Sequence, residues 1–148
     1  MIALPDVNVL LALVWSNHSY HEAAHEWLGS ESAAGWATCL WTQSAFLRLS
    51  LNPQVVGAAI DCSAAVQLLN ELVAHPLHHY FDSAPALDTE SFAELIPRIV
   101  GYRQVSDATL LHLARVHGLK LVTFDQAIAA ICPWNENLLI LSPTALTT

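Results

Sequence analysis

The chain contains 148 residues, of which 54% are hydrophobic, and its formal net charge is −8 at pH 7. That length fits one domain with a sizeable core, so we expect residues 1–148 to form a single domain. Because the sequence has only five Lys and Arg residues, the composition excludes a protein that binds nucleic acid through a broad basic surface.

The sequence shows neither a membrane span nor a secretory segment. No apolar run reaches the roughly 20 residues needed to cross a bilayer. The segment before Trp15 lacks a basic start and contains Asp6, which argues against a secretory signal. We therefore expect a cytoplasmic protein with no membrane partner. The high mean hydropathy of +0.42 predicts a protein interface instead.

The first predicted elements are a strand at residues 1–4 and an apolar helix at 7–14, and Asp6 lies between them. A polar turn leads to an amphipathic helix at 20–28. Histidines at spacings of three and four mark this segment: His18, His21 and His25. A metal site on one surface helix needs a further ligand, and the sequence marks none. We interpret these histidines as facing solvent or a protein partner.

A second strand is predicted at 36–41, and a helix capped by Thr42 follows until Asn52 and Pro53 end it. Residues 58–75 contain a longer helix with a regular apolar face. Three histidines after it are interpreted as a solvated turn before a short strand at 79–81. They are His75, His78 and His79.

Residues 89–99 predict a further helix, because Glu90 and Glu94 fall in its early turns. Near the C-terminus, 126–131 predicts a short helix and 138–141 an edge strand. Strands alternate with helices throughout the chain. This order predicts a three-layer α/β/α sandwich around a mostly parallel central sheet.

The segment 104–125 organises the candidate site. Ser106 is a favoured N-cap residue type, and Asp107 falls in the first helical turn, where negative charge is stabilising. Gly118 ends this helix, and 119–124 predicts a buried parallel strand. The polar side of the helix is expected to face solvent; it carries Thr109, His112 and Arg115.

Three aspartates are expected to converge at one edge of the sheet. The helix and the strand each extend roughly 16 to 20 Å, so the chain goes out and returns, and Asp125 ends near Asp107. Asp6 also follows a strand, and ligands of open α/β sheets bind beyond the carboxyl ends of the strands. Without matched Lys or Arg, the three carboxylates repel one another unless a hard divalent cation neutralises them. This predicts a Mg²⁺ or Mn²⁺ site.

Four stretches of the chain resemble the PIN-domain ribonucleases, and in particular the VapC-type toxins of bacterial toxin–antitoxin pairs. They are PDVNVLLAL, HSYHEAAHEWL, SDATLLHLARVHG and LVTFD, and they span most of the length. The resemblance implies a PIN-like fold and a Mg²⁺-dependent endoribonuclease toxin of a type II toxin–antitoxin system, which hydrolyses RNA with a metal-activated water. It also implies an RNA substrate, a VapB-type antitoxin and a homodimer.

The resemblance assigns roles to individual side chains. The implied catalytic residues and metal ligands are Asp6, Asp107 and Asp125. Their supporting polar companions are Asn8 and Thr123. The candidates to hold the RNA backbone are Arg48 and Arg103.

One position departs from the family pattern. The family usually carries a glutamate three residues before the position of Arg48, and this chain has Ala45 there. The nearby Gln43 and Ser44 are polar but supply no charge. An attenuated PIN-domain protein that acts mainly by binding its antitoxin is therefore one alternative. A Mg²⁺-dependent phosphatase of the haloacid-dehalogenase type is another, although such a site needs an aspartate where this chain has Asn8.

The three cysteines are widely separated and form no CxxC pair. They are Cys39, Cys62 and Cys132. Their neighbours are apolar, so we predict reduced, buried thiols and neither disulfides nor zinc ligands.

Overall fold

The fold is built on a five-stranded sheet. The computed structural model describes residues 1–31 and 34–143. Its strands lie in the order β3-β2-β1-β4-β5, and every pairing among them is parallel. They are β1 (Ala3–Pro5), β2 (Trp36–Cys39), β3 (His78–Phe81), β4 (Lys120–Thr123) and β5 (Leu138–Ile140). Because β1 is central, the residue that follows it stands in the middle of the carboxyl edge.

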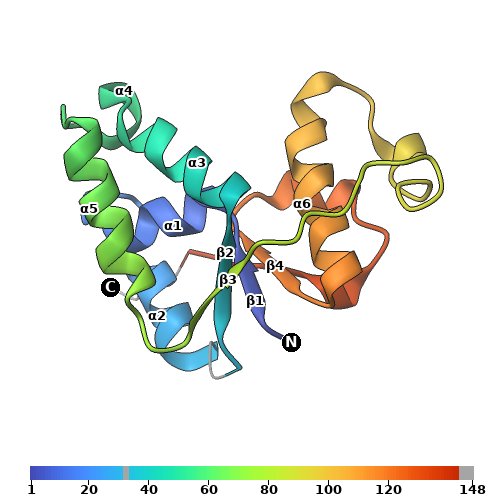
Figure 1. The fold of residues 1–148 in the computed structure, drawn as a ribbon, viewed down its shortest axis with the longest axis horizontal. Helices are drawn as coiled ribbons and strands as arrows, with labels where there is room; N and C mark the ends of the chain where they lie inside the picture. The colour runs from blue at the N-terminus through green and yellow to red at the C-terminus, as the bar shows by residue number, and fades with distance from the viewer. Residues whose placement is uncertain (32–33, 144–148) are drawn as a thin grey trace.

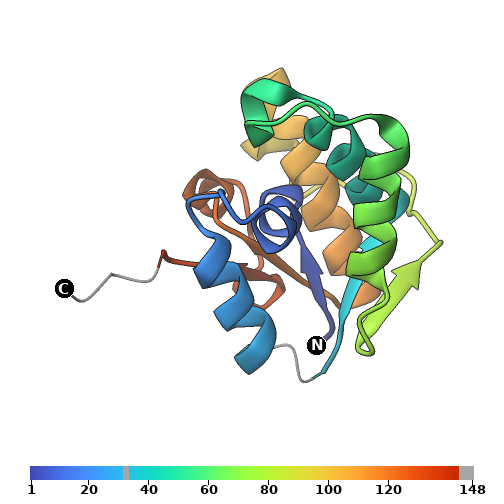
Figure 2. The same cartoon turned by 90° about the vertical axis from the view of Figure 1, so that its left-hand side faces the viewer.

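Helices cover both faces of the sheet. They are α1 (Val7–Val14), α2 (His21–Glu31), α3 (Leu40–Ser50), α4 (Pro53–Val56), α5 (Cys62–Val73) and α6 (Val105–His117), with 3₁₀ turns η1 (Ile96–Arg98), η2 (Tyr102–Gln104), η3 (Gln126–Ala130) and η4 (Asn135–Asn137). Figures 1 and 2 show α6 on one side of the sheet and α1, α2, α3 and α5 on the other. Each side has its own hydrophobic cluster. The predicted three-layer α/β/α sandwich is confirmed.

Two of the predicted surface histidines have a packing role. His21 Nδ1 donates to the Ala12 carbonyl and His25 Nε2 to the Leu13 carbonyl, each at 2.7 Å. The last carbonyls of a helix lack partners within it, so these rings complete the end of α1 and hold α2 against it.

Within the described residues no helix is long and apolar enough to cross a membrane.

Two helices begin earlier than the sequence suggested. Cys39 is the N-cap of α3, and Thr42 lies at its third position, where Thr42 Oγ1 accepts from the Cys39 N–H at 3.1 Å. Thr42 therefore caps α3 from inside the helix. The second strand ends at Cys39. Similarly, α6 begins at Val105 directly after η2, so Ser106 lies in the first turn and does not cap it.

The predicted helix at 89–99 was wrong. Residues 89–95 form turns, and only Ile96–Arg98 is a short 3₁₀ helix. The Asp88 carboxylate accepts from the backbone N–H groups of Glu90 and Ser91 at 3.1 and 2.8 Å. Such local bonds offer the backbone an alternative to a regular helix.

This irregular segment also explains why His112 was misplaced. The His112 side chain was expected in solvent but is only 1% exposed. The Phe92 ring packs edge-on against it, with ring centroids 5.3 Å apart. The polar side of α6 is therefore covered by the irregular segment that precedes this helix in the sequence.

Two smaller expectations also changed. β3 begins at His78, whose Nε2 lies 2.8 Å from Thr38 Oγ1 on the neighbouring strand, so this histidine belongs to the sheet and not to a solvated turn. Burial lowers the pKa of His78, and the neighbouring histidines lower it further. Cys39 and Cys132 are buried free thiols as predicted, whereas Cys62 is exposed.

Candidate active site

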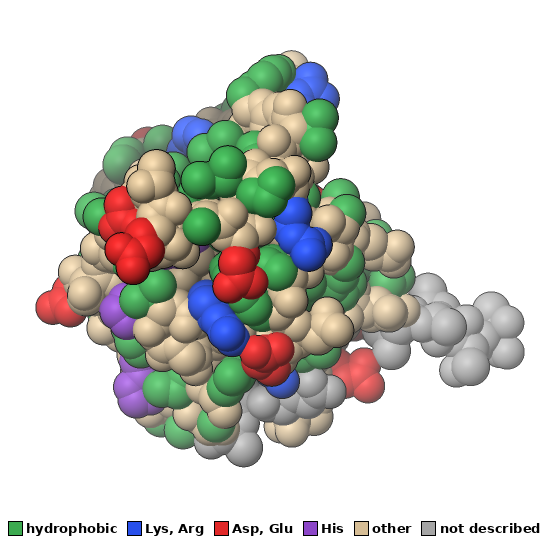
Figure 3. Space-filling view, turned by 90° about the vertical axis from the view of Figure 1, so that its right-hand side faces the viewer, with side chains coloured by type: hydrophobic (Ala, Val, Ile, Leu, Met, Phe, Trp, Pro, Cys, Tyr) green, Lys and Arg blue, Asp and Glu red, His purple; other side chains and the backbone are tan. Residues whose placement is uncertain are grey.

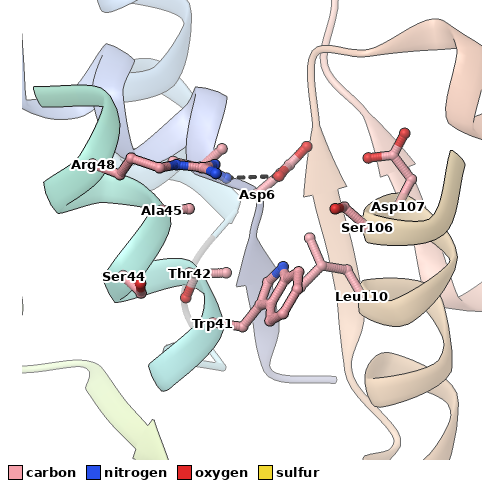
Figure 4. Close-up of a pocket in the computed structure, with 10 residues that line it drawn as sticks. Asp6, Trp41, Thr42, Ser44, Ala45, Arg48, Ser106, Asp107 and Leu110 are labelled. Carbon is pink, nitrogen blue, oxygen red and sulfur yellow. Dashed lines mark hydrogen bonds between the residues drawn. The ribbon is translucent and has the colours of Figure 1, made fainter. Parts of the chain in front are cut away.

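Asp6 stands at the carboxyl end of the central strand. It is 7% exposed and is the N-cap of α1, and its Oδ1 accepts from the Val7 N–H at 2.7 Å (Figure 4, dashed line). Its own backbone N–H donates to the Val122 carbonyl of β4 at 2.8 Å. The backbone on both sides of Asp6 is therefore fixed, and the carboxylate points to the edge of the sheet.

Thr123 ties three parts of this edge together. Thr123 Oγ1 donates to Asp6 Oδ2 at 2.9 Å and accepts from Asn8 Nδ2 at 3.2 Å and from the Asp125 N–H at 3.0 Å. Asn8 Oδ1 in turn accepts from the Phe124 N–H at 3.4 Å. The hydroxyl uses its one hydrogen and both lone pairs. Asn8 and Thr123 thus hold Asp6 in place, which fits the supporting role expected of them.

Asp125 follows β4 at the same edge of the sheet. Its Oδ1 accepts from the Ala127 N–H at 2.9 Å, which caps η3, and its side chain is exposed. Burial is the main cause that raises the pKa of both Asp6 and Asp107, and the negative charge of Asp125 adds to the rise. It therefore acts electrostatically on the other two carboxylates.

Asp107 faces Asp6 across a cavity of about 380 Å³, which we call the acidic pocket (Figure 4). Asp107 lies in the first turn of α6 and is half-buried. Burial raises the pKa of Asp107 to about 6, and the charges of Asp6 and Asp125 contribute to that rise. In the described part of the chain no hydrogen bond reaches the Asp107 carboxylate.

Helix α3 forms the opposite wall of the acidic pocket. Ser44, Ala45 and Arg48 line it, as Figure 4 shows. Gln43 does not, because its Nε2 donates to Thr38 Oγ1 at 2.9 Å on the other side of the helix. Ala45 therefore occupies the place in the pocket wall where the family resemblance suggested a glutamate.

The two candidate RNA-binding arginines differ in position. Arg48 is exposed and lines the acidic pocket. Arg103 is exposed on η2, where its Nε donates to Tyr102 Oη at 3.3 Å and its guanidinium lies 5.7 Å from the Tyr102 ring. It is not among the residues that line the pocket. The structure thus brings one of the two arginines to the carboxylates.

The acidic pocket suits a hard cation by its donor chemistry. Burial raises the pKa of Asp6, although its hydrogen bonds with Thr123 and Val7 oppose the rise. None of the ion pairs among the described residues involves these carboxylates. Each carboxylate offers about four acceptor positions, so Asp6 keeps free lone pairs beside its two bonds. An oxygen-only donor set of this kind is what Mg²⁺ prefers.

The ligand set is open as it stands. Among residues 1–31 and 34–143, no group of three His, Cys, Asp or Glu side chains is close enough to hold a metal ion. Asp6 and Asp107 share the pocket, while Asp125 is not among its lining residues. Mg²⁺ usually keeps several waters and takes only one or two protein carboxylates. The geometry fits two carboxylates with a third negative charge nearby.

Sequence reasoning missed Trp41, which also lines the acidic pocket. It was placed at the end of a strand, but α3 already begins at Leu40. On a helix, residues three and four positions apart share a face. Trp41, Ala45 and Arg48 follow that spacing, so an earlier helix start would have predicted their common wall.

A PIN domain family model matches residues 3–132. Ribonuclease VapC38 of Mycobacterium tuberculosis is 43% identical over 128 residues, which cover 86% of this chain and 87% of that protein. Ribonuclease VapC29 of the same organism is 38% identical over 146 residues, covering 97% and 98%.

Two solved structures share the fold at low sequence identity. The VapBC2 structure from Rickettsia felis, bound to a DNA fragment from their promoter, has a TM-score of 0.63 at 15% identity and covers 96% of this chain and 100% of that chain. Mycobacterium tuberculosis VapC20, described as a sarcin-ricin loop cleaving toxin, has a TM-score of 0.62 at 17% identity, covering 86% and 93%.

Proposed function

This chain belongs to the PIN domain family, and on that premise we propose that it is a Mg²⁺-dependent endoribonuclease toxin of the VapC type, part of a type II toxin–antitoxin system. Relatives at 36 to 43% identity are named ribonucleases VapC, and PIN-domain ribonucleases of this type generally use a divalent metal. The observation that carries the proposal is the acidic pocket, where Asp6 and Asp107 face each other without a cationic partner in the described residues.

Each side chain has a defined task in this proposal. Asp6 and Asp107 would hold Mg²⁺, and Asp125 adds negative charge that acts on Asp107. When bound there, Mg²⁺ would supply a water of lowered pKa and positive charge beside the phosphate oxygens. Thr123 fixes the Asp6 carboxylate through the 2.9 Å hydrogen bond. Arg48, at the mouth of the pocket, binds the RNA backbone; we keep Arg103 as a second, more distant contact.

The substrate is RNA and the protein partner is a VapB-type antitoxin, since one structural relative is a VapBC complex. We also propose a homodimer, because large apolar side chains stand in solvent: Val100 is 91% exposed and Tyr102 81%. The space-filling view of the side that carries α6 shows hydrophobic side chains at many points, including the projection at its top (Figure 3). Such surfaces mark protein interfaces.

Residues 1–148 form a single PIN-like domain in this proposal. The family model begins at residue 3 and ends at 132, and β5 (Leu138–Ile140) extends the same sheet by pairing with β4. Because RNA and a toxin's antitoxin are cytoplasmic, the proposal includes a cytoplasmic location.

The test is cleavage of an end-labelled RNA pool by the purified chain, with Mg²⁺, with Mn²⁺ and with a chelator. We expect cleavage with either metal, none with the chelator, and recovery when Mg²⁺ is added back. An uncut pool in both metals, with a folded protein that binds its antitoxin, would favour the attenuated alternative that Ala45 suggests. The phosphatase alternative has no support, because the Asn8 side chain is bonded to Thr123 and Phe124.

A further inference from the structure

A second cavity, which we call the side cavity, adjoins the acidic pocket. It has a volume of about 210 Å³ and lies between the start of α3, the edge strand β3 with the loop after it, and α6. The two cavities share Trp41 and Leu110 in their walls. A group in the side cavity therefore lies next to whatever the acidic pocket holds.

The wall of the side cavity is held by specific contacts. His112 Nε2 donates to the Ala86 carbonyl and His117 Nε2 to the Ser83 carbonyl, each at 3.0 Å. Both histidines lie on α6, and both carbonyls lie on the loop after β3, which lines the cavity. The Phe81 ring also contacts His117, with centroids 5.6 Å apart. Two bonds from a helix thus fix the loop, and the cavity is a built feature of the fold.

The rim that the two cavities share is aromatic and open to solvent. The Trp41 side chain is 50% exposed although it stands between two cavities, and Figure 4 shows its indole ring beside the acidic pocket. Within the side cavity, Tyr80 and Phe81 add aromatic rings, and Asp82 and Thr109 add polar side chains. Ligand pockets for drug-sized molecules span about 300–1,000 Å³. A smaller cavity of this composition suits one planar ring system with polar edges.

The charge of the chain leaves few cations for RNA binding. The formal net charge is −8, with only five Lys and Arg residues, and Arg115 is paired with Glu136 at 2.7 Å. Neutralisation of phosphates normally dominates nucleic-acid affinity, and here few cations are available for it. Unpaired bases that stack on aromatic side chains supply affinity without charge.

We propose that Trp41 is a stacking platform for one unpaired base of the RNA substrate, and that the side cavity receives this base while the adjoining phosphate lies in the acidic pocket. This rests on the proposed ribonuclease function and deepens it. The substrate is then RNA whose nucleotide beside the cleaved bond is single-stranded or flipped out. Duplex RNA, whose bases are stacked inside the helix, cannot make this contact.

The first test measures binding and not cleavage. A fluorescently labelled pool of short single-stranded RNA is titrated with Asp107→Asn protein, which leaves the RNA intact. Adding Trp41→Ala to this background should weaken binding about 5- to 150-fold, the range of one base–aromatic stack. Trp41→Phe keeps a flat ring and should retain most of the affinity. Leu51→Ala is the control, because Leu51 is an exposed apolar residue at the end of the same helix, lines neither cavity and should change binding little.

The second test removes the base instead of the indole. RNAs that the unaltered protein cleaves are remade with a single abasic nucleotide at each position beside the cut. One position should weaken binding as much as Trp41→Ala does, and combining the two changes should cost no more than either alone. If the unaltered protein cleaves no RNA, the ribonuclease proposal fails, and the loss of pool binding in Trp41→Ala still reports on the stack.

Three results would overturn the stacking proposal. Trp41→Ala could bind single-stranded RNA as tightly as its parent. Its affinity for duplex RNA could fall as much as its affinity for single-stranded RNA. Finally, Trp41→Ala could leave RNA binding intact while it changes the oligomeric state in light scattering, in which case the rim is a protein interface.

Discussion

The two walls of the acidic pocket differ in how their polar groups are held. On the β1 and β4 side, Asp6 accepts hydrogen bonds from Val7 and Thr123, and Thr123 is itself bonded to Asn8 and to the Asp125 backbone. On the α6 side, the Asp107 carboxylate has no hydrogen bond in the described part of the chain. One carboxylate is fixed before any ligand arrives, and the other is left to interact with one.

This difference has an electrostatic consequence. The hydrogen bonds of Asp6 oppose the rise that burial causes in its pKa. For Asp107 burial and the neighbouring negative charges all act in the same direction, and its pKa reaches about 6. A cation in the pocket should therefore stabilise the charged form of Asp107 more than that of Asp6. The following changes are ways to break or sharpen that contrast, beginning with the largest effect.

Asp107→Asn and Asp6→Asn should each abolish most RNA cleavage, since loss of a metal ligand forfeits several kcal/mol of transition-state stabilisation, roughly a thousandfold in rate. Their folding should differ. Asp107→Asn removes an unpaired charge, so we expect an equal or higher melting temperature in metal-free buffer. Asp6→Asn replaces one of two accepting oxygens, which serve Val7 and Thr123, with an NH₂ donor, so we expect a lower melting temperature. Cleavage assays and thermal denaturation measure the two effects.

Asp61→Asn is the control for the loss of one negative charge. Asp61 is exposed and caps α5 through a 2.8 Å bond from the Ala64 N–H, and asparagine caps a helix about as well. This variant should cleave RNA at the parent rate. A similar loss of activity in Asp61→Asn would show that overall charge, and not the pocket, explains the result.

The positions of the polar residues at the ends of β1 and β4 could be predicted from the sequence. The residue at which α3 begins could not. Asp6 and Asp125 follow apolar strands and Thr123 ends one, and parallel strands bring such positions to one edge. Trp41 was missed because Cys39 is not a usual N-cap residue, so nothing in the sequence marked the start of α3. The side chain that does close that turn, Thr42, lies inside the helix.

The burial of His112 could not be predicted for a different reason. Periodicity describes a helix against one core, and it placed His112 on the polar side of α6. In the structure the loop before α6 returns over that side, where the Ala86 carbonyl accepts from His112. Contacts between an irregular loop and a helix leave no repeat in the sequence. The side cavity, which depends on that loop, was therefore invisible before the fold was known.

Thr123→Val tests whether the fixed wall matters for the reaction. The change keeps the shape but removes the hydroxyl that serves Asp6, Asn8 and the Asp125 backbone. We expect activity or metal affinity to fall by about 10- to 100-fold, which is the usual effect of removing a hydrogen-bond partner of a metal ligand. Buried groups left without partners should also cost about 1–3 kcal/mol of folding free energy. Cleavage rates and chemical denaturation measure both.

Thr38→Val provides the matched comparison. Thr38 is also fully buried, and its hydroxyl is bonded to Gln43 and His78, but Thr38 does not line the acidic pocket. A similar loss of stability with nearly unchanged activity is expected. Equal loss of activity in both variants would mean that Thr123 acts only through stability.

The pH dependence of Asp107 is the third way to test the contrast. The pKa of Asp107 is raised to about 6, against about 3.9 for an unfolded aspartate. The folded state favours the protonated form, so this contribution to stability is fully present below about pH 4 and is lost as pH rises through about 6. In chelator, the melting temperature of the parent should fall over that window more than that of Asp107→Asn. Mg²⁺ binding should weaken below about pH 6. Identical pH profiles of melting would show that Asp107 titrates normally.

The smallest expected effect concerns Ala45, which lines the pocket on the wall opposite Asp107. Ala45→Glu would add a carboxylate there, and hard cations follow carboxylate count closely. At a separation of about 8 Å in water, one further unit charge and a divalent ion attract each other by about 1 kcal/mol, so the half-saturating Mg²⁺ concentration should fall by about fivefold. Without metal the added charge should raise the pKa of Asp107 further and lower the melting temperature. Ala45→Gln, which has nearly the same shape but no charge, should leave the Mg²⁺ requirement unchanged. If both variants are folded and saturate at the parent's Mg²⁺ concentration, the cation lies beyond the reach of residue 45, and the open ligand set is completed from another side of the pocket.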